Sequence, residues 1–392
     1  MELHERLRRE LGELQRVGRY RRLPLLGGRA GGRVMVDGQW LVNLSSNDYL
    51  GLAALVERER GDGVAVEELD LGMTSSSSRL LTGNHEPYGA LEGMLATLYG
   101  REAALVLNSG YHANIGLLPA LAGRHDLVLS DRLNHASIID GMRLADAQFL
   151  RYRHGDCDHL ELLLADAVGR YRQVFVVTES IFSMDGDRAD LRRLVALKRQ
   201  YGAFLIVDEA HAVGVLGRQG LGLCEEVGVV NDVDVIIGTF GKALASMGAY
   251  VVLDDVVREY LVNTMRSLIF TTALPPAVVA WSMRMVERSV GMELERVALQ
   301  GLAGRLRGEL AGVGVVTGGD SHIVPVLTGG DEQALRVAAV LRDAGFLGMA
   351  VRPPTVPVGS SRIRLSLHAL LEWEDVAAIP ALFAGMKREG VV

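Results

Sequence analysis

The sequence has little cysteine, which argues against two kinds of structural site. Its 392 residues include two cysteines, Cys157 and Cys224. They lie far apart, with no CxxC motif and no cysteine or histidine at zinc-ligand spacing. We therefore expect neither a disulfide framework nor a metal site, and we interpret both residues as ordinary thiols in a reducing cytoplasm.

Long apolar runs and an excess of positive charge are also missing. No uninterrupted apolar stretch reaches the roughly 18 residues that a membrane-spanning helix needs, and the first residues, MELHERLRRELGELQRVGRYRR, are charged and amphipathic, unlike a signal peptide. The formal net charge is -7, whereas a nucleic-acid-binding domain normally carries a basic surface. These features predict a cytoplasmic protein that binds neither membrane nor nucleic acid.

Apolar residues make up 49% of the chain, and their arrangement predicts the fold class. From about residue 86 onward, short continuous apolar runs alternate with helical patterns. Such runs are typical of parallel strands that helices cover on both faces of a sheet. We therefore expect an α/β fold with a mainly parallel central sheet. The predicted strands are residues 103–107, 127–129, 174–177, 204–207, 233–237 and 249–253.

The two ends of the chain differ from this middle region. Leucines at helical spacing near the N-terminus predict a helix, and residues 34–42 predict a hairpin that turns at Asp37-Gly38. A long helical stretch, residues 277–312, leads into a smaller α+β region. The predicted organisation is an N-terminal segment of residues 1–45, a large domain of residues 46–285 and a small C-terminal domain of residues 286–392.

Polar residues follow five of the predicted strands. Because ligands of open α/β sheets bind beyond the carboxyl ends of the strands, we expect these five exits to converge on one site. The exits are Asn108-Ser109-Gly110, Ser130-Asp131, Thr178-Glu179-Ser180, Asp208-Glu209 and Gly238-Thr239.

The segment Asp208-Glu209-Ala210-His211 follows a predicted buried strand. A carboxylate at the strand tip can bond a protonated pyridine nitrogen, which keeps the ring cationic and makes it an electron sink. His211 could then bond the phenolic oxygen of the same ring. The four letters DEAH also occur in helicase-type ATPases, but the nearest match to a phosphate-binding loop, residues 236–243, lacks its first glycine and its final Ser or Thr.

Lys242 follows another predicted strand, in the segment Gly238-Thr239-Phe240-Gly241-Lys242. A lysine that is desolvated near a cation has a lowered pKa, so its neutral amine can attack an aldehyde. Thr239 could bond a phosphate. A lysine after a strand is more often a solvated surface residue. The prediction that Lys242 forms a Schiff base with an aldehyde therefore depends on the other exits.

Three more segments supply candidates of the same kind. Gly110 and Tyr111 stand between a predicted strand and a helical pattern, where backbone N–H groups can bind a phosphate. His135 lies at another exit and could stack on a flat ring, and Ser183 offers a hydroxyl in a turn-rich loop. Each feature is common in proteins without any ligand. Their combination indicates a cofactor site.

The motifs TESIFSMDGD, VDEAHAVGVLG, GTFGKALASMGAY and LIFTTALPP, in this order and spacing, resemble the α-oxoamine synthases, pyridoxal-phosphate enzymes of fold type I. The resemblance covers nearly the whole chain. It implies Lys242, His135 and Asp208 as catalytic residues, with Lys242 on the cofactor, His135 stacked on its ring and Asp208 on the pyridine nitrogen. It also implies cofactor contacts from His211 and Ser183 at the phenolic oxygen, Gly110 and Tyr111 in the cradle, Thr239 at the phosphate, and Thr271 and Thr272 across the boundary of a homodimer.

The segment from Val351 to Leu367 resembles the biotin-pathway members of this family, which condense L-alanine with a pimeloyl thioester of coenzyme A or a carrier protein. The resemblance implies that Arg364 grips the amino-acid carboxylate, a task suited to a guanidinium fork, and that Asn47 assists it. Thr355 and Arg21 are the other predicted substrate contacts, with Arg22 as an alternative to Arg21.

One loop does not distinguish between the possible substrates of this family. Residues 81–88, LTGNHEPY, also resemble members of the family that use glycine or serine. A glycine C-acetyltransferase and a serine-using acyltransferase are therefore the alternative activities.

Overall fold

The computed structural model describes residues 3–61 and 72–391, which form two compact units. Unit 1 contains residues 3–61, 183–187 and 297–391, and unit 2 contains residues 72–182 and 188–296. The loop 183–187 therefore belongs to unit 1, although it interrupts the sequence of unit 2. The three-part division predicted from the sequence stays a prediction.

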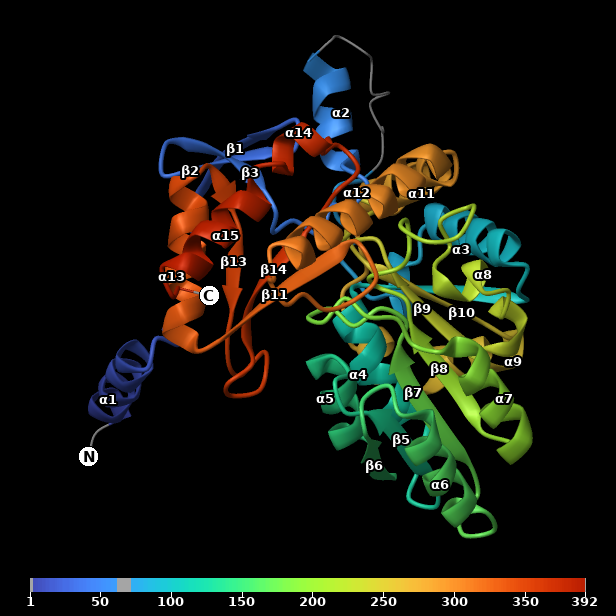
Figure 1. Ribbon diagram of the computed structural model, residues 1–392. Helices are drawn as coiled ribbons and strands as arrows, with labels where there is room; N and C mark the ends of the chain where they lie inside the picture. Colours follow the sequence, from blue (N-terminus) through green and yellow to red (C-terminus); the bar gives the residue numbers. More distant parts are fainter. Residues whose placement is uncertain (1–2, 62–71, 392) are drawn as a thin grey trace. The chain divides into compact units, whose positions relative to one another are not determined.

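Among the described residues of unit 2, seven strands form one sheet in the order β4-β10-β9-β8-β7-β5-β6 (Figure 1). The pairs from β9 to β6 are parallel, whereas β10 runs antiparallel to both of its neighbours. The predicted mainly parallel sheet is confirmed. The strands are β4 (Ala103–Leu107), β5 (Leu127–Asp131), β6 (Gln148–Tyr152), β7 (Val174–Glu179), β8 (Phe204–Asp208), β9 (Val235–Thr239) and β10 (Ala249–Leu253).

Helices cover both faces of this sheet, as Figure 1 shows for α4 and α5 on one side and α6 and α7 on the other. On the first face, an apolar core of buried residues such as Leu117, Ile206 and Val251 joins the strands to α4, α5, α9 and α10. On the second face, α3 packs against β4 and β10. The helices are α3 (Glu86–Tyr99), α4 (Gly110–Leu121), α5 (Ala136–Leu144), α6 (Cys157–Ala167), α7 (Leu191–Tyr201), α8 (Leu223–Glu226), α9 (Asp255–Thr264) and α10 (Arg266–Ile269).

The strand directions place the predicted exits along one edge of the sheet. Strands β5, β7, β8 and β9 are parallel neighbours, and β4 has the same direction because two antiparallel pairings separate it from β9. Ala249, the first residue of β10, pairs with Leu107 and Thr239 at that edge. The carboxyl edge is thus where the candidate residues of unit 2 gather.

The predicted helical stretch 277–312 is two helices, α11 (Pro276–Val290) and α12 (Glu293–Gly312). The break falls at Gly291 and Met292. Arg296, in the first turn of α12, donates to the carbonyl oxygens of Ser289 at 2.6 Å and Val290 at 3.1 Å. These bonds satisfy carbonyls that the end of α11 leaves without a helical partner.

Within the described residues of unit 1 there are two small sheets, ordered β1-β2-β3-β12 and β11-β14-β13. The predicted hairpin is confirmed, with Asp37 and Gly38 at φ of 49° and 81° in its turn. Helix α13 packs on the second sheet, over buried residues such as Ile363 and Leu365. The elements are α1 (Leu3–Arg16), β1 (Leu26–Ala30), β2 (Arg33–Val36), β3 (Gln39–Asn43), α2 (Leu52–Gly61), β11 (Ile323–Gly329), α13 (Asp331–Asp343), β12 (Phe346–Leu347), β13 (Met349–Val351), β14 (Ser361–Ser366), α14 (Trp373–Val376) and α15 (Ile379–Arg388).

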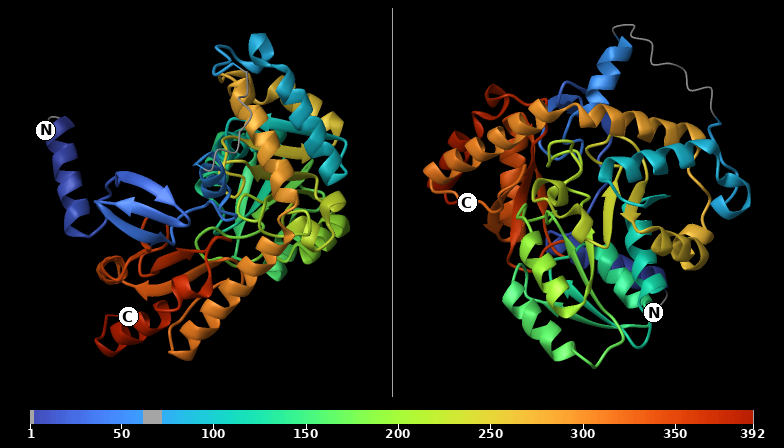
Figure 2. Two further views of the ribbon diagram at one scale, coloured as in Figure 1. Left: turned by 90° about the horizontal axis from the view of Figure 1, so that it is seen from above. Right: turned by 90° about the vertical axis from the view of Figure 1, so that its right-hand side faces the viewer.

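Helix α1 is amphipathic, as predicted, but none of its residues is buried. It lies apart from strands β1 to β3, as Figure 2 shows. Leu3, Leu7, Leu11 and Leu14 are 40–58% exposed. In the part of the chain that the structure describes, no helix has the length and apolar character to span a bilayer.

Candidate active site

Asp208 lies at the end of β8 with its carboxylate fixed by two donors. Its side chain is buried, and Oδ2 accepts a hydrogen bond of 2.8 Å from Nδ2 of Asn114, on α4. Oδ1 accepts from the backbone N–H of Ala210 at 2.9 Å. Asn114 is not predictable from the sequence as a site residue, because an asparagine inside a helix carries no signal of a contact with a distant strand.

Lys242 and His211 contact each other at the same edge. The distance between Lys242 Nζ and His211 Nε2 is 2.8 Å, and Lys242 is partly buried. Thr239 holds the turn that presents this lysine, since its hydroxyl accepts from Gly241 N at 3.2 Å and donates to Gly248 O at 3.1 Å. The lysine predicted from the motif is therefore not a freely solvated surface residue.

His135 joins the same network from α5, which it caps. Its backbone N–H donates to Glu179 Oε1 at 2.6 Å, and its Nδ1 lies 2.7 Å from the hydroxyl of Ser137. That hydroxyl accepts from Asn114 Nδ2 at 3.0 Å, and the same Nδ2 also donates to Asp208. A hydrogen-bonded chain thus joins the imidazole to the carboxylate.

The pKa of His135 is lowered, chiefly because burial disfavours the charged ring. The positive charge of Lys242 acts in the same direction, and the negative charge of Asp208 opposes it. Ser137 N donates to Nδ1 at 3.3 Å, so we assign the ring proton of the neutral imidazole to Nε2.

The N-terminus of α4 offers backbone donors beside these residues. Ser109 caps the helix by accepting from His112 N at 3.2 Å, and Gly110 and Tyr111 form the first turn. The Tyr111 ring is about half exposed, and its hydroxyl donates to Asp140. Backbone N–H groups at a helix N-terminus are a natural seat for a phosphate.

Thr271 and Thr272 are tied to the exit of β4 by Asn108. Asn108 Nδ2 donates to Thr271 Oγ1 at 3.3 Å and to the carbonyl of Thr272 at 2.7 Å. Their predicted contact with the cofactor of a second subunit stays a prediction.

The side chains at this edge fit pyridoxal phosphate. The structure brings together an aspartate suited to a pyridine nitrogen, a lysine amine suited to an aldehyde, an imidazole and a helix N-terminus suited to a phosphate. The arrangement does not favour the ATPase alternative. Glu209, the second residue of the DEAH segment, is fully buried against Ser180, Leu223 and Cys224.

Arg364 is the centre of a second cluster, within unit 1. It lies on β14 with 9% of its surface exposed. Its guanidinium donates to Ser183 O at 2.6 Å, Ser366 Oγ at 2.7 Å, Tyr49 OH at 3.0 Å and Asn47 Oδ1 at 3.3 Å. The predicted neighbour Asn47 is present. Ser183 contributes a backbone carbonyl here, so its predicted hydroxyl contact with the cofactor stays a prediction.

A cavity of about 220 Å³ adjoins Arg364 and contains two further arginines. Arg21 Nη2 donates to Thr355 Oγ1 at 2.9 Å, and both residues line the cavity. Arg352 also lines it, and the pKa of Arg352 is lowered by burial and by the charge of Arg21. Arg22 does not line this cavity and lies over the ring of Tyr20. Arg21 therefore lines the cavity and Arg22 does not, and the predicted contact of Arg21 with the substrate stays a prediction.

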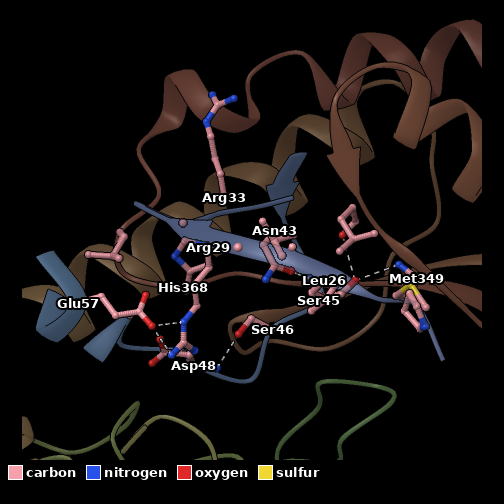
Figure 3. Close-up of a pocket in the computed structure, with 18 residues that line it drawn as sticks. Leu26, Arg29, Arg33, Asn43, Ser45, Ser46, Asp48, Glu57, Met349 and His368 are labelled. Carbon is pink, nitrogen blue, oxygen red and sulfur yellow. Dashed lines mark hydrogen bonds and ion pairs between the residues drawn. The ribbon is translucent and has the colours of Figure 1, made fainter. Parts of the chain in front are cut away.

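A larger cavity of unit 1, about 710 Å³, shares Ser45 and Met349 with the arginine cavity (Figure 3). Arg29 and Glu57 form an ion pair at 2.6 Å in its wall. Burial raises the pKa of Asp48 to about 6 and lowers that of His368 to about 4. The wall therefore combines apolar residues with two polar groups whose charged forms are disfavoured.

Comparisons with known proteins agree with this site. A model of the aminotransferase class I and II family matches residues 40–379. The chain is 57% identical to the 8-amino-7-oxononanoate synthase of Chlorobaculum parvum (strain DSM 263 / NCIMB 8327), over 99% of this chain and 100% of that protein. Among solved structures, Sphingomonas wittichii serine palmitoyltransferase is 31% identical with a TM-score of 0.89, and a structure of SPT with a PLP internal aldimine is 28% identical with a TM-score of 0.90. Both comparisons cover 100% of each chain.

The mainly parallel sheet, with Lys242 and Asp208 at its carboxyl edge, defines the class of fold type I pyridoxal-phosphate enzymes. The identity to the Chlorobaculum protein extends over essentially the whole of both chains. The chain belongs to the aminotransferase class I and II family and, within it, to the 8-amino-7-oxononanoate synthases. The family resemblance identified from the motifs is thereby confirmed.

Proposed function

We propose that the protein condenses L-alanine with a pimeloyl thioester, with loss of carbon dioxide, to give 8-amino-7-oxononanoate for biotin synthesis. The full-length similarity to a synthase of that name supports the reaction. The structural observation that carries the substrate proposal is the cavity lined by Arg21, Arg352 and Thr355 beside Arg364.

The arginines match the charges of the two substrates. Arg364 is held by four acceptors, including Asn47 and Tyr49, and it is suited to the carboxylate of alanine. Arg21 and Arg352 then remain for the terminal carboxylate of the pimeloyl chain. An acetyl or palmitoyl group has no such carboxylate, so the glycine C-acetyltransferase and serine-using alternatives leave these two cations unexplained.

Pyridoxal phosphate, when bound, supplies an electron sink for negative charge at the α-carbon of the amino acid. Asp208, fixed by Asn114, would hold a proton at the pyridine nitrogen, and the backbone N–H groups of the first turn of α4 would bind the phosphate. Thr239 would join them by turning its hydroxyl proton from Gly248 O to the phosphate. Lys242 Nζ, beside His211, removes and returns the proton at the α-carbon. His135 would cover the ring and donate from Nε2 to the acyl carbonyl, because its Nδ1 is occupied by Ser137.

We infer that the enzyme works as a cytoplasmic homodimer with shared active sites. The motif that contains Thr271 and Thr272 and the exposed leucines of α1 support this assembly.

The test is product identification by mass spectrometry. Alanine, glycine and serine are each supplied with pimeloyl, acetyl and palmitoyl thioesters, and the pimeloyl group is supplied on coenzyme A and on acyl carrier protein. We expect 8-amino-7-oxononanoate from alanine and a pimeloyl thioester. An amino ketone formed from glycine and acetyl-CoA but not from alanine and pimeloyl thioesters would overturn the proposal.

A matched pair of variants tests the cavity. Arg21→Met removes a cation that lines the cavity, and we expect the KM for the pimeloyl thioester to rise by at least about tenfold. Arg22→Met removes the neighbouring cation outside the cavity and should leave KM unchanged.

A further inference from the structure

Glu209 is a fully buried carboxylate at the carboxyl edge that the proposed reaction does not use. Its side chain accepts from the hydroxyl of Ser180, from Leu223 N at 3.0 Å and from Cys224 N at 2.6 Å. Burial raises the pKa of this acid, and the same donors act in the opposite direction. Burying a carboxylate costs folding free energy, and none of these three partners is a cation that would offset this cost. We therefore expect Glu209 to have a structural role, in which it holds neighbouring segments in place.

The three donors belong to two segments that Glu209 ties together. Ser180 follows β7, whereas Leu223 and Cys224 begin α8. Gly222 precedes them with φ of 114°, and a Cβ on this glycine would lie 2.7 Å from the Glu209 carboxyl carbon. The chain therefore needs glycine at this position for the carboxylate to reach α8.

The polar contacts around Glu209 continue towards β10 through Tyr99 and Tyr250, and we call this group of residues the polar layer. Tyr99 OH donates to the carbonyl of Leu221 at 2.9 Å and lies 2.8 Å from Tyr250 OH. Tyr250 pairs with Gly238 of β9, and a side chain on that glycine would collide with the tyrosine ring. Thr239, which holds the turn of Lys242, is the next residue of β9.

The layer lies on the opposite side of the sheet from Asp208. Ile206 of β8 and Val251 of β10 belong to the core that faces α4, and Asp208 bonds Asn114 on that helix. Successive residues of a strand point to opposite faces. Glu209 and Tyr250 therefore support, from the opposite face of the sheet, the edge that carries Asp208 and His211.

We propose that Glu209 is a positioning residue of the active site, whose buried carboxylate locks the exit of β8 to the segment after β7 and to α8, so that Asp208 and His211 stay aligned with the cofactor. Its role is geometric, and it touches neither substrate nor cofactor. This inference rests on the proposed function, in which Asp208 and His211 hold pyridoxal phosphate.

The isosteric change Glu209→Gln tests this positioning role. An amide nitrogen at Oε2 would face Leu223 N–H, and one at Oε1 would face Cys224 N–H, so one donor loses its acceptor in either orientation. We expect the Kd for pyridoxal phosphate to rise by about tenfold or more, and the pH midpoint of the cofactor's visible absorption band to shift, because Asp208 and His211 lose their alignment.

Asp126→Asn is the matched control. Asp126 is also a fully buried acid of this sheet unit, and it accepts from Gly123 N at 2.8 Å and pairs with Arg172, but it precedes β5 at the opposite edge. We expect this variant to lower the melting temperature while its cofactor Kd and absorption midpoint match those of the wild type.

Ser180→Ala is the second test variant, to be used if Glu209→Gln does not fold. It removes a single donor, so we expect a smaller change of the cofactor Kd and absorption midpoint in the same direction. The inference fails if the folded variants at Glu209 and Ser180 lose thermal stability but keep the wild-type Kd and absorption midpoint. If the wild-type protein itself gains no visible band with pyridoxal phosphate, the proposed function fails, and this outcome is distinct from the first.

Discussion

Arg364 shows why a buried cation can be maintained on a strand. Four of its five N–H groups have an oxygen acceptor among the described residues, and none of these four acceptors is a carboxylate, so they do not neutralise the positive charge of the guanidinium. Such a group remains available for an incoming anion. Its orientation depends on Tyr49, a fully buried residue that no sequence motif indicates as part of the site.

Tyr49→Phe tests this orientation. The change keeps the ring, which packs 4.1 Å from His322, and removes the hydroxyl that bonds Arg364 Nη2 and Asn47 Oδ1. We expect the KM for alanine to rise by about fivefold to tenfold, in line with the loss of a hydrogen bond to a charged group, while the KM for the pimeloyl thioester stays the same. Steady-state kinetics with each substrate varied in turn measure both constants, and a change in the thioester constant alone would contradict the assignment.

His368 makes stability depend on pH. Burial lowers its pKa from 6.5 to about 4 in the folded protein, so the folded state binds a proton less readily than the unfolded chain. The contribution of the neutral His368 ring to the free energy of unfolding is fully present above about pH 6.5 and is lost as pH falls towards 4. The shift corresponds to about 3 kcal/mol.

Urea unfolding at a series of pH values measures this effect. The difference in unfolding free energy between wild type and His368→Leu should fall by about 3 kcal/mol from pH 7 to pH 4. The exposed His4, replaced by Gln, is the control and should not change the slope. A pH-independent difference for His368→Leu would show that the ring is not buried in its neutral form.

At the scale of elements, the contact between α4 and α5 sets the geometry of the cofactor site. Gly141 of α5 lies so close to α4 that a Cβ would overlap the carbonyl oxygen of Asn114. Asn114 fixes Asp208, and His135 caps α5, so both helices carry site residues. A small residue at the crossing is therefore a requirement of the site as well as of the packing.

Gly141→Ala should destabilise the fold by about 1–3 kcal/mol through overpacking, and it should weaken cofactor binding because α4 and α5 must separate. Thermal unfolding and a fluorescence titration with pyridoxal phosphate measure the two effects. Gly93→Ala, in an exposed position of α3 with nothing within 4 Å of the added Cβ, is the control. We expect that change to stabilise the protein by about 0.5–1 kcal/mol.

At the scale of the whole molecule, the proposed sharing of active sites between two subunits predicts complementation between inactive chains. In a mixed dimer of Lys242→Ala and Thr272→Ala chains, one site combines the intact Lys242 of one chain with the intact Thr272 of the other. Equal random mixing should recover about a quarter of wild-type activity, since half of the dimers are mixed and each has one intact site.

The control mixes Lys242→Ala with Asp208→Asn. Both changes affect residues that one chain contributes to the same edge, so every site in the mixed dimer lacks one of them and no recovery is expected. Assays after joint refolding or coexpression measure both pairs. Recovery in the control, or none in the test pair, would contradict sharing through Thr272.

The sequence was most informative where local chemistry carries the signal. Apolar runs identified six strands, and the polar residues after them identified Lys242, Asp208 and His211 as neighbours at one edge. Strand β6 was missed because four of its five residues are exposed, which removes the continuous apolar pattern of the other strands. The break between α11 and α12 was missed because Arg296, one turn beyond it, satisfies the helix end by a contact that no periodicity reveals.

The sequence by itself determined the α/β class, the motif residues and the membership of the family. The reason is that the apolar pattern of a strand and the polar residues that follow it depend only on residues close together in the chain. Only the tertiary structure decided that β10 runs antiparallel, that Asn114 fixes Asp208, that Tyr49 holds Arg364 and that Arg21 rather than Arg22 lines the arginine cavity. These features depend on contacts between residues far apart in the chain. Which of several equivalent polar residues makes such a contact is fixed by packing and strand register, and a linear pattern carries neither.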